Sequence, residues 1–277
     1  MIRGTTKLIA HIGYPTDTFK APMIYNPWFE KAGVNAVVVP MGVKAEDFSS
    51  SFDAIFKLSN IHGALITMPH KVSVVSELDD VTPTVKIAGS CNAVLRRADG
   101  SLFGDMFDGE GFVRGVLRKG KQLRGAKVLV VGCGGVGSAI AASLAKEHPT
   151  AIGLYDANAA SAKALGERLS QHYPKIKVTT GSNDPAGCDV VVNATPLGMK
   201  AGDPMPMDVS RMASTTFVGE VVMKQEMTAF LEAAHKRGCQ YQIGTDMLFE
   251  QIPAYLEFFG FPSTTADELR KVARIAY

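Results

Sequence analysis

The stretch VLVVGCGGVGSAIAASL, residues 128–144, constrains the fold of this chain more than any other segment. A buried apolar run leads into a G-x-G-x-x-G turn, and an alanine-rich helical pattern follows at once. The first glycine permits a tight turn, the second lets a pyrophosphate approach the backbone, and the third lets the helix pack on the strand. The free N–H groups at the start of the helix favour phosphate. We therefore predict a dinucleotide-binding unit, whose cofactor contacts are Gly132, Gly134, Gly135, Val136 and Gly137.

An acidic residue follows the next apolar run. Asp156, in AIGLYDANAAS, lies nineteen residues after Gly137, where a carboxylate accepts hydrogen bonds from the adenosine ribose. The 2′-phosphate of NADP would meet like charge there, and no arginine is adjacent. We therefore predict NAD rather than NADP as the cofactor. The other interpretation of Asp156 is a cap of the following helix, and one carboxylate can serve both purposes.

Short apolar runs alternate with helical patterns along most of the chain. Strands are predicted at 7–13, 34–43 and 62–69, and a hairpin turns at Asp99-Gly100. Such alternation favours an α/β protein with two parallel sheets and crossover helices. The predicted domains are an N-terminal α/β substrate-binding domain, a Rossmann NAD-binding domain, and C-terminal helices that return to the first domain. Their residues are 1–107 plus 247–277 for the first and 108–246 for the second.

Composition excludes several classes of protein. Hydrophobic residues make up 46% of the 277 residues and charged residues 20%, which is typical of a chain with a large core. The net charge is +2 and the basic residues are scattered, so we expect no nucleic-acid partner. No apolar run approaches the roughly 18 residues of a membrane span, and no signal peptide is evident. The four scattered cysteines indicate reduced thiols in a cytoplasmic protein, and no metal site is predicted.

Four further stretches, with the glycine loop, resemble the blocks of the shikimate dehydrogenase family in the family's order. They are ITMPHK (66–71), GDMFDGEGF (104–112), VVNATPLGM (191–199) and MLFEQ (247–251). The resemblance implies reversible hydride transfer between the nicotinamide and a cyclic hydroxy acid, such as shikimate or quinate, bound between the two domains. It also implies a role in aromatic amino acid biosynthesis. We expect a small-molecule substrate and a monomer or homodimer.

The resemblance also assigns roles to single residues. Lys71 matches the catalytic lysine of the family, and Asp108 matches its aspartate partner. A neutral lysine accepts the proton released on alcohol oxidation if burial lowers its pKa, whereas a nearby carboxylate raises that pKa. Taken singly, Lys71 is also interpretable as a surface lysine and Asp108 as a helix cap. The positions that match substrate contacts are Thr67, Asn92 and Gln251. Those on the nicotinamide side are Asn193, Thr195, Leu197, Gly198, Met199, Val221 and Gly244.

The chain departs from the family where the substrate carboxylate is held. Two serines of a Ser-Lys-Ser-Pro segment become Phe19 and Ala21, in TDTFKAP, so two hydroxyl donors are lost. Thr16 and Thr18 lie beside them as alternative donors. Other substrate-side positions are apolar as well: Leu65, Phe107 and Met223.

Two explanations of these departures compete. The first is a dehydrogenase for a less polar or differently placed acid or alcohol, with shikimate or quinate as the fallback substrate. The second is a non-catalytic descendant that binds a dinucleotide or ligand and acts as a regulator. Lys71, Asp108 and the nicotinamide-side loop persist, which favours the enzyme. A purely structural Rossmann-like protein would not explain the lysine and aspartate.

Overall fold

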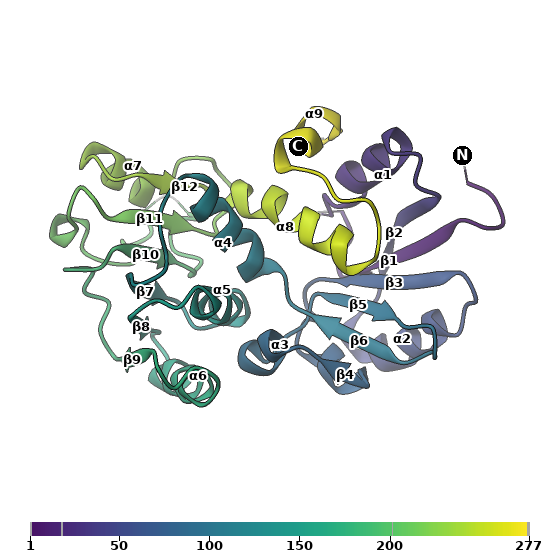
Figure 1. Cartoon of the computed structure of the whole chain (residues 1–277), viewed down its shortest axis with the longest axis horizontal. Helices are drawn as coiled ribbons and strands as arrows, with labels where there is room; N and C mark the ends of the chain where they lie inside the picture. The colour runs from purple at the N-terminus through teal and green to yellow at the C-terminus, as the bar shows by residue number, and fades with distance from the viewer. Residues whose placement is uncertain (1, 18, 201, 276–277) are drawn as a thin grey trace. The chain divides into compact units, whose positions relative to one another are not determined.

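A computed structural model describes residues 2–17, 19–200 and 202–275. The chain is an α/β protein that divides into two compact units, Met1–Phe107 with Ile252–Tyr277, and Asp108–Gln251 (Figure 1). The predicted fold class is confirmed. The second boundary lies inside α8 (Gly244–Phe258), five residues beyond the predicted one. The reason is close packing, because a Cβ at Gly111 in α4 (Asp108–Arg118) would lie 2.5 Å from the Met247 carbonyl oxygen.

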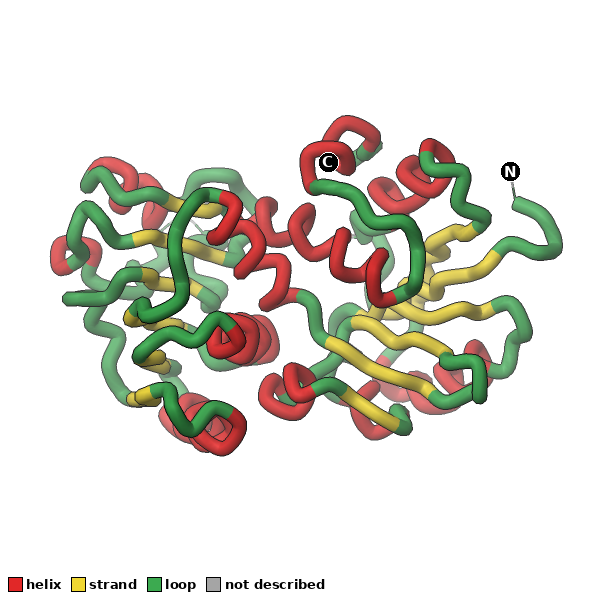
Figure 2. Tube along the Cα trace, viewed as in Figure 1, coloured by secondary structure: helices red, strands yellow, loops and turns green. Residues whose placement is uncertain are grey.

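The first unit is built on a six-stranded sheet in the order β2-β1-β3-β5-β6-β4 (Figure 2). Its strands are β1 (Lys7–Gly13), β2 (Ala36–Gly42), β3 (Ile61–Ile66), β4 (Asp80–Val81), β5 (Ala93–Arg96) and β6 (Leu102–Asp105). Its helices are α1 (Pro22–Lys31), α2 (Phe48–Phe56), α3 (Pro83–Ala88), the end of α8 and α9 (Ala266–Val272), with short 3₁₀ turns η1 (Ala45–Asp47) and η2 (Ser73–Glu77).

The first sheet is mixed, which corrects the expectation of two parallel sheets. β1 pairs in parallel with β2 and β3, whereas β5 runs antiparallel to both β3 and β6. The cause is the predicted hairpin: Gly100 adopts φ +90°, and Arg97 N–H donates to the Ser101 carbonyl at 2.9 Å. A two-stranded hairpin reverses the chain, so its second strand cannot stay parallel to its first.

The terminal helix α9 packs on α1 within this unit. The Lys31 ammonium lies 2.9 Å from Glu268 Oε2, and Arg274 N–H donates to the Met23 carbonyl at 2.8 Å. The amphipathic α1 begins at Pro22, whose fixed φ suits the first helical position. Residues far apart in the chain therefore complete one core.

The second unit is a six-stranded, wholly parallel sheet in the order β12-β11-β10-β7-β8-β9. Its strands are β7 (Lys127–Val131), β8 (Ala151–Tyr155), β9 (Lys177–Thr180), β10 (Val190–Asn193), β11 (Phe217–Glu220) and β12 (Tyr241–Gln242). Its helices are α4, α5 (Gly135–Lys146), α6 (Ala159–His172), α7 (Ala229–Lys236) and the start of α8, with the 3₁₀ turn η3 (Val209–Arg211). Strands buried on both faces read as continuous apolar runs, as VLVV and VVV do here.

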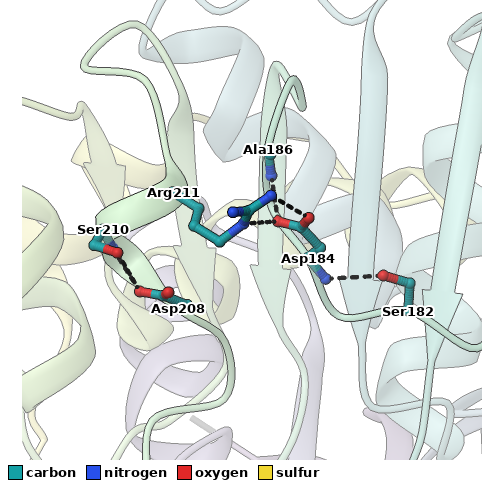
Figure 3. A network of polar contacts seen from close by, with 6 residues as sticks. All are labelled: Ser182, Asp184, Ala186, Asp208, Ser210 and Arg211. Atoms are coloured by element: carbon teal, nitrogen blue, oxygen red, sulfur yellow. Dashed lines mark hydrogen bonds and ion pairs between the residues drawn. The ribbon is translucent and has the colours of Figure 1, made fainter.

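A polar network ties the segment after β9 to η3 (Figure 3). The Arg211 guanidinium forks onto Asp184, with Nε 2.7 Å from Oδ1 and an Nη 2.8 Å from Oδ2. Asp184 also accepts from the Ala186 N–H at 3.0 Å, and Asp208 accepts from the Ser210 hydroxyl at 2.7 Å. Because the network is exposed, we assign it to loop geometry rather than to stability.

No helix within residues 2–17, 19–200 and 202–275 combines the length and apolar character needed to cross a membrane.

The contact of Gly219 in β11 with Phe112 in α4 predicts a stability effect. A Cβ at Gly219 would lie 2.4 Å from the Phe112 ring, which is fully buried. We expect Gly219→Ala to lower the free energy of unfolding by about 1–3 kcal/mol, the usual cost of overpacking, measured by urea denaturation. Gly4→Ala is the control, since nothing lies within 4 Å of its Cβ. Equal stability of the two variants would contradict the packing argument.

Candidate active site

The predicted glycine loop forms the tight turn that its motif requires. Gly132 adopts φ +99°, and a Cβ there would lie 2.7 Å from the Ala194 carbonyl carbon. A Cβ at Gly137 would lie 1.8 Å from the Gly132 carbonyl oxygen, which no side chain tolerates. Gly134 differs, because it is exposed and a Cβ placed there would have nothing within 4 Å. Two glycines thus serve packing, and the third leaves open space in front of α5.

The start of α5 suits a pyrophosphate. The first amides of a helix lack intrahelical acceptors, and here they belong to Gly135, Val136 and Gly137. Gly134 and Gly135 are exposed, so an anion can reach these donors. The nearby Cys133 thiol is not a competing nucleophile, because burial and the charge of Asp156 raise its pKa to about 12. The residues present therefore fit a dinucleotide phosphate.

Asp156 has a structural role in this unit. Its Oδ2 accepts from the Cys133 N–H at 2.7 Å, and its Oδ1 accepts from the Asn158 N–H at 2.8 Å. Asn158 in turn caps α6 by accepting from the Ala160 N–H at 3.1 Å. Both carboxylate oxygens of Asp156 therefore brace the loops around the glycine turn. This bracing explains an acidic residue here without reference to a ribose.

Most of the predicted nicotinamide-side residues, Asn193 to Met199, lie at the end of β10 and in the loop that follows it. The Asn193 carboxamide accepts from the Thr195 N–H and hydroxyl at 3.1 and 2.6 Å, and donates to the Leu197 carbonyl at 3.0 Å. Val221 N–H donates to the Asn193 carbonyl at 3.2 Å. A Cβ at Gly244 would lie 2.0 Å from the Val222 carbonyl oxygen, so these positions gather at one edge of the parallel sheet. Met199 is 43% exposed at the end of the loop.

In the first unit, Lys71 lies in the turn that follows β3. His70, just before it, is buried, stacks on Phe48 at 4.2 Å between ring centroids, and has Nε2 2.7 Å from the Val43 carbonyl oxygen. The Lys71 carbonyl accepts from the Cys91 N–H at 2.7 Å. The half-buried lysine is thus held on a fixed backbone.

Two predicted substrate contacts lie on the same frame. Asn92 is 1% exposed, its Oδ1 accepts from the Phe107 N–H at 2.9 Å, and its carbonyl accepts from the Ile66 N–H at 2.9 Å. Thr67 N–H donates to the Ile12 carbonyl at 2.9 Å. The structure therefore brings Thr67, Lys71 and Asn92 to neighbouring segments, at the carboxyl ends of β1 and β3 and the start of β5.

Phe19 packs against the end of β1. Its ring stacks on His11 with centroids 4.1 Å apart, and a Cβ at Gly13 would lie 2.9 Å from the Phe19 ring and 2.3 Å from Thr67 Cγ2. An aromatic ring therefore lies beside Thr67. Ala21 is half-buried at the start of α1. Thr18 lies outside the described residues.

The other apolar departures differ in their surroundings. Leu65 is 4% exposed within β3. Phe107 packs in an aromatic cluster of the first unit, 4.8 Å from Tyr255 and 5.4 Å from Phe258 between ring centroids. Met223, in the second unit, is 46% exposed. Leu65 and Phe107 thus contribute to the core, whereas Met223 presents its side chain to solvent.

Asp108 and Gln251 belong to the second unit. Asp108 begins α4, and a Cβ at Gly109 would lie 2.0 Å from the Ala139 carbonyl oxygen, so α4 approaches α5 closely. A Cβ at Gly111 would lie 2.6 Å from Gln251 Cβ. This packing holds Gln251 against Gly111, which lies one turn along α4 from Asp108, and the buried Gln251 Oε1 has no hydrogen-bond partner.

Two buried polar residues escaped the sequence-based prediction. His11 is 7% exposed with Nδ1 unpartnered, and burial together with the charge of Lys71 lowers its pKa to about 4. Glu220 is fully buried at the end of β11, and burial raises the pKa of its carboxyl. In the sequence, His11 is the titratable residue of the apolar segment AHIG, and Glu220 is that of FVGE. A single titratable side chain in an apolar strand was the signal that could have identified both residues.

No group of three or more potential metal ligands occurs in the part of the chain that the structure describes.

The chain is similar to known proteins over nearly its whole length. Residues 11–94 match the family model "Shikimate dehydrogenase substrate binding domain". The Rubrobacter xylanophilus shikimate dehydrogenase (NADP(+)) is 33% identical over 254 residues, which cover 90% of this chain and 89% of the relative. The Listeria monocytogenes shikimate 5-dehydrogenase, solved with shikimate and NAD, is 25% identical with a TM-score of 0.91 and covers 98% and 97% of the two chains.

A further solved structure is similar in fold. The Thermus thermophilus shikimate 5-dehydrogenase, in complex with NADP(H) and shikimate, has a TM-score of 0.85 at 22% identity and covers 97% and 99% of the two chains.

The predicted preference for NAD is contradicted by the curated relatives. The Rubrobacter protein and further curated relatives are NADP(+) enzymes. The prediction took the Asp156 carboxylate as a ribose acceptor. Its two oxygens instead accept backbone N–H groups, so the residue type alone was a poor guide to the cofactor.

His11 predicts a pH dependence of stability. Its pKa is about 4 in the fold against 6.5 unfolded, so between these values the unfolded chain binds more protons. The contribution of His11 is therefore full above pH 6.5 and is lost as the pH falls toward 4. The loss should reach about 3 kcal/mol, at roughly 1.4 kcal/mol per pKa unit.

The measurement is urea denaturation from pH 7 to 4 on the wild type and on His11→Phe, which retains an aromatic ring against Phe19. Subtracting the two curves isolates His11 from the other titrating groups. A difference that stays flat between pH 6.5 and 4 would show that the imidazole is not held neutral.

Proposed function

Because the chain belongs to the shikimate dehydrogenase family, we propose that it is an NADP-dependent dehydrogenase that transfers a hydride between the nicotinamide and a carbon bearing a hydroxyl group. The curated relatives support the enzyme class and the cofactor. The observation that carries the proposal is the glycine turn at the start of α5, with exposed Gly134 and Gly135 in front of free helix amides. A merely structural turn would not need this open approach.

Two parts of the second unit hold the cofactor in this proposal. The amides of Gly135, Val136 and Gly137 bind the pyrophosphate. The loop Asn193–Met199, with Val221 and Gly244, contacts the nicotinamide side. When bound, the nicotinamide supplies the hydride acceptor for oxidation and the donor for reduction.

Lys71 and Asp108 manage the proton that accompanies the hydride. In oxidation the Lys71 amine takes the proton of the substrate hydroxyl, and in reduction the ammonium returns it to the new alkoxide oxygen. Asp108 orients the Lys71 Nζ and stabilises its charged form.

The proposed substrate is a cyclic hydroxy acid or related alcohol other than shikimate. Thr67, Asn92 and Gln251 supply polar contacts, and the unpartnered Gln251 Oε1 supports a ligand donor there. The Phe19 ring lies against Thr67 and Gly13 in place of a hydroxyl. Without the two serine hydroxyls that Phe19 and Ala21 replace, a substrate carboxylate would be buried unpaired. That loses far more binding free energy than a poor apolar fit does. A less polar or differently placed substituent would therefore bind better on that side.

The proton assignment predicts a loss of turnover. Lys71→Ala and Asp108→Ala should each lower kcat with the true substrate by about 10²–10⁴, the usual value of a positioned acid or base. The double variant should lose little more than the worse single one, because one residue serves the other. Steady-state kinetics with NADP, after a screen of cyclic hydroxy acids and alcohols at the nicotinamide absorbance band, measures this.

Lys57→Ala is the matched control, since Lys57 is exposed at the end of α2 and its ammonium pairs with Asp53, one helical turn earlier. Near-normal turnover of a folded Lys71→Ala protein would place the proton carrier elsewhere. Dinucleotide binding with no turnover of any tested alcohol would favour the non-catalytic regulator.

The loss of two hydroxyl donors at Phe19 and Ala21 predicts a low kcat/KM for shikimate. Two hydroxyl donors to a carboxylate contribute together about 3–6 kcal/mol, so their loss should lower kcat/KM for shikimate by about 10²–10⁴ relative to an ordinary family member. Phe19→Ser with Ala21→Ser should raise kcat/KM for shikimate and quinate, though incompletely, because Leu65, Phe107 and Met223 still differ. The comparison uses steady-state kinetics with NADP.

The single variant Phe19→Leu is the control, because it shortens the ring without supplying a hydroxyl. Wild-type oxidation of shikimate at an ordinary efficiency, about 10⁴ M⁻¹s⁻¹ or more, would mean that another group binds the carboxylate.

A further inference from the structure

Two polar residues end adjacent strands of the parallel sheet. Asn193 closes β10 and Glu220 closes β11, and the two are direct partners in the strand register. Both are 0% exposed. The carboxyl ends of parallel strands are where such a sheet binds its ligands. A carboxyl group buried at this edge therefore calls for an explanation beyond packing.

Asn193 determines the shape of the loop that follows it. Its Oδ1 accepts from the N–H and the hydroxyl of Thr195, and its Nδ2 donates to the Leu197 carbonyl. The Thr195 hydroxyl oxygen accepts from the Leu197 N–H at 3.1 Å. The Asn193 carboxamide thus holds the loop through both its oxygen and its nitrogen. A flip that exchanges Oδ1 and Nδ2 would break these hydrogen bonds.

Glu220 connects this carboxamide to α7. Its Oε2 accepts from the Thr228 hydroxyl at 3.0 Å and lies 3.5 Å from Asn193 Nδ2. Thr228 also caps α7, accepting from the Leu231 N–H at 3.2 Å. Gly198, with φ +98°, approaches the same threonine, since a Cβ there would lie 3.4 Å from Thr228 Cβ. The loop and the helix cap therefore meet at Glu220.

The two contacts of Oε2 differ in strength. The Thr228 bond has ordinary length, whereas the separation from Asn193 Nδ2 is at the outer limit of a hydrogen bond. At that distance the carboxyl oxygen acts mainly through its negative charge or dipole. It favours the orientation in which the Asn193 NH₂, rather than its carbonyl oxygen, faces β11. Oxygen facing oxygen would be repulsive in these dry surroundings.

Glu220 is an unfavourable residue for packing alone. Its Oε1 is buried without a hydrogen-bond partner, and burial raises the pKa of the carboxyl. Unsatisfied buried acceptors are rare in proteins because water no longer compensates them. A methionine would fill the same volume without that penalty.

We propose that Glu220 is a positioning residue for the loop Asn193–Met199: it selects the orientation of the Asn193 carboxamide and joins the loop to the cap of α7. The ordered loop then presents Thr195 and Leu197 in one conformation. The effect on cofactor affinity rests on the proposed function, in which this loop contacts the nicotinamide. The effect on the loop itself does not.

The test compares Glu220→Met, which keeps the shape and removes both oxygens, with Glu220→Gln, which keeps an acceptor for Thr228. Hydrogen exchange is measured on the cofactor-free proteins. In Glu220→Met the Thr195 and Leu197 amides should exchange on the order of tenfold faster, while amides in β11 keep their wild-type rates. Glu220→Gln should restore most of the protection. If Glu220→Met does not fold, Glu220→Asp should give an intermediate increase at the same two amides.

Thr216→Val is the matched control. Thr216 is 1% exposed at the opposite end of β11, and its hydroxyl donates to the Cys188 carbonyl at 2.9 Å. This variant also removes one buried hydrogen bond, but far from the loop along the strand. It should leave the Thr195 and Leu197 amides protected. Wild-type loop exchange in Glu220→Met, or equal loosening in Thr216→Val, would overturn the positioning role.

Equilibrium titration with NADP supplies the second readout. Glu220→Met should weaken NADP binding on the order of tenfold, and kcat at saturating NADP should change much less than KM does. If the wild type does not bind NADP, the proposed function fails while the exchange experiment still decides the role of Glu220. Glu220→Met could instead loosen the loop and still bind NADP as tightly as the wild type does. The loop would then not contribute to cofactor affinity, and that part of the proposal would be wrong.

Discussion

The second unit depends on backbone contacts that exclude side chains. A Cβ at Gly137 would almost coincide with the Gly132 carbonyl oxygen, and one at Gly132 would collide with the Ala194 backbone. Only glycine at both positions lets α5 begin directly against the ends of β7 and β10. That closeness fixes where the helix amides point. It also brings the loop after β10 beside the turn, so the phosphate donors and the Asn193 network share one edge.

The first unit applies a different constraint to its own edge. Backbone hydrogen bonds from Thr67 to β1 and from Cys91 to Lys71, with one from the Phe107 N–H to Asn92 Oδ1, hold the polar positions in place. The side chains around them are largely apolar or neutral, since Phe19 stacks on His11 and burial keeps the imidazole uncharged. In the proposed function, such surroundings disfavour a charged substituent, while Lys71 and Asn92 stay at the same edge. The contrast between this hydrogen-bonded backbone and its apolar side chains is the physical basis of the proposed change of substrate.

Local patterns predicted much of the architecture. The first strand was placed at its observed bounds, Lys7–Gly13, because a short apolar run that ends in glycine is a local signal. The hairpin at Asp99-Gly100 followed from turn chemistry. The sheet direction did not follow, because strand pairing is set by contacts between distant segments. The extent of the second unit to Gln251 likewise depends on Gly111 packing against α8.

The sequence by itself determined the α/β class, the glycine turn and the positions that match the family motifs, because each depends on neighbouring residues or on a short motif. Tertiary structure alone decided what surrounds those positions. Asp156 braces the glycine turn through two backbone N–H groups, Phe107 joins an aromatic cluster, and His11 and Glu220 become buried titratable groups. Burial and hydrogen-bond partners come from segments far away in the chain, so no local pattern carries them.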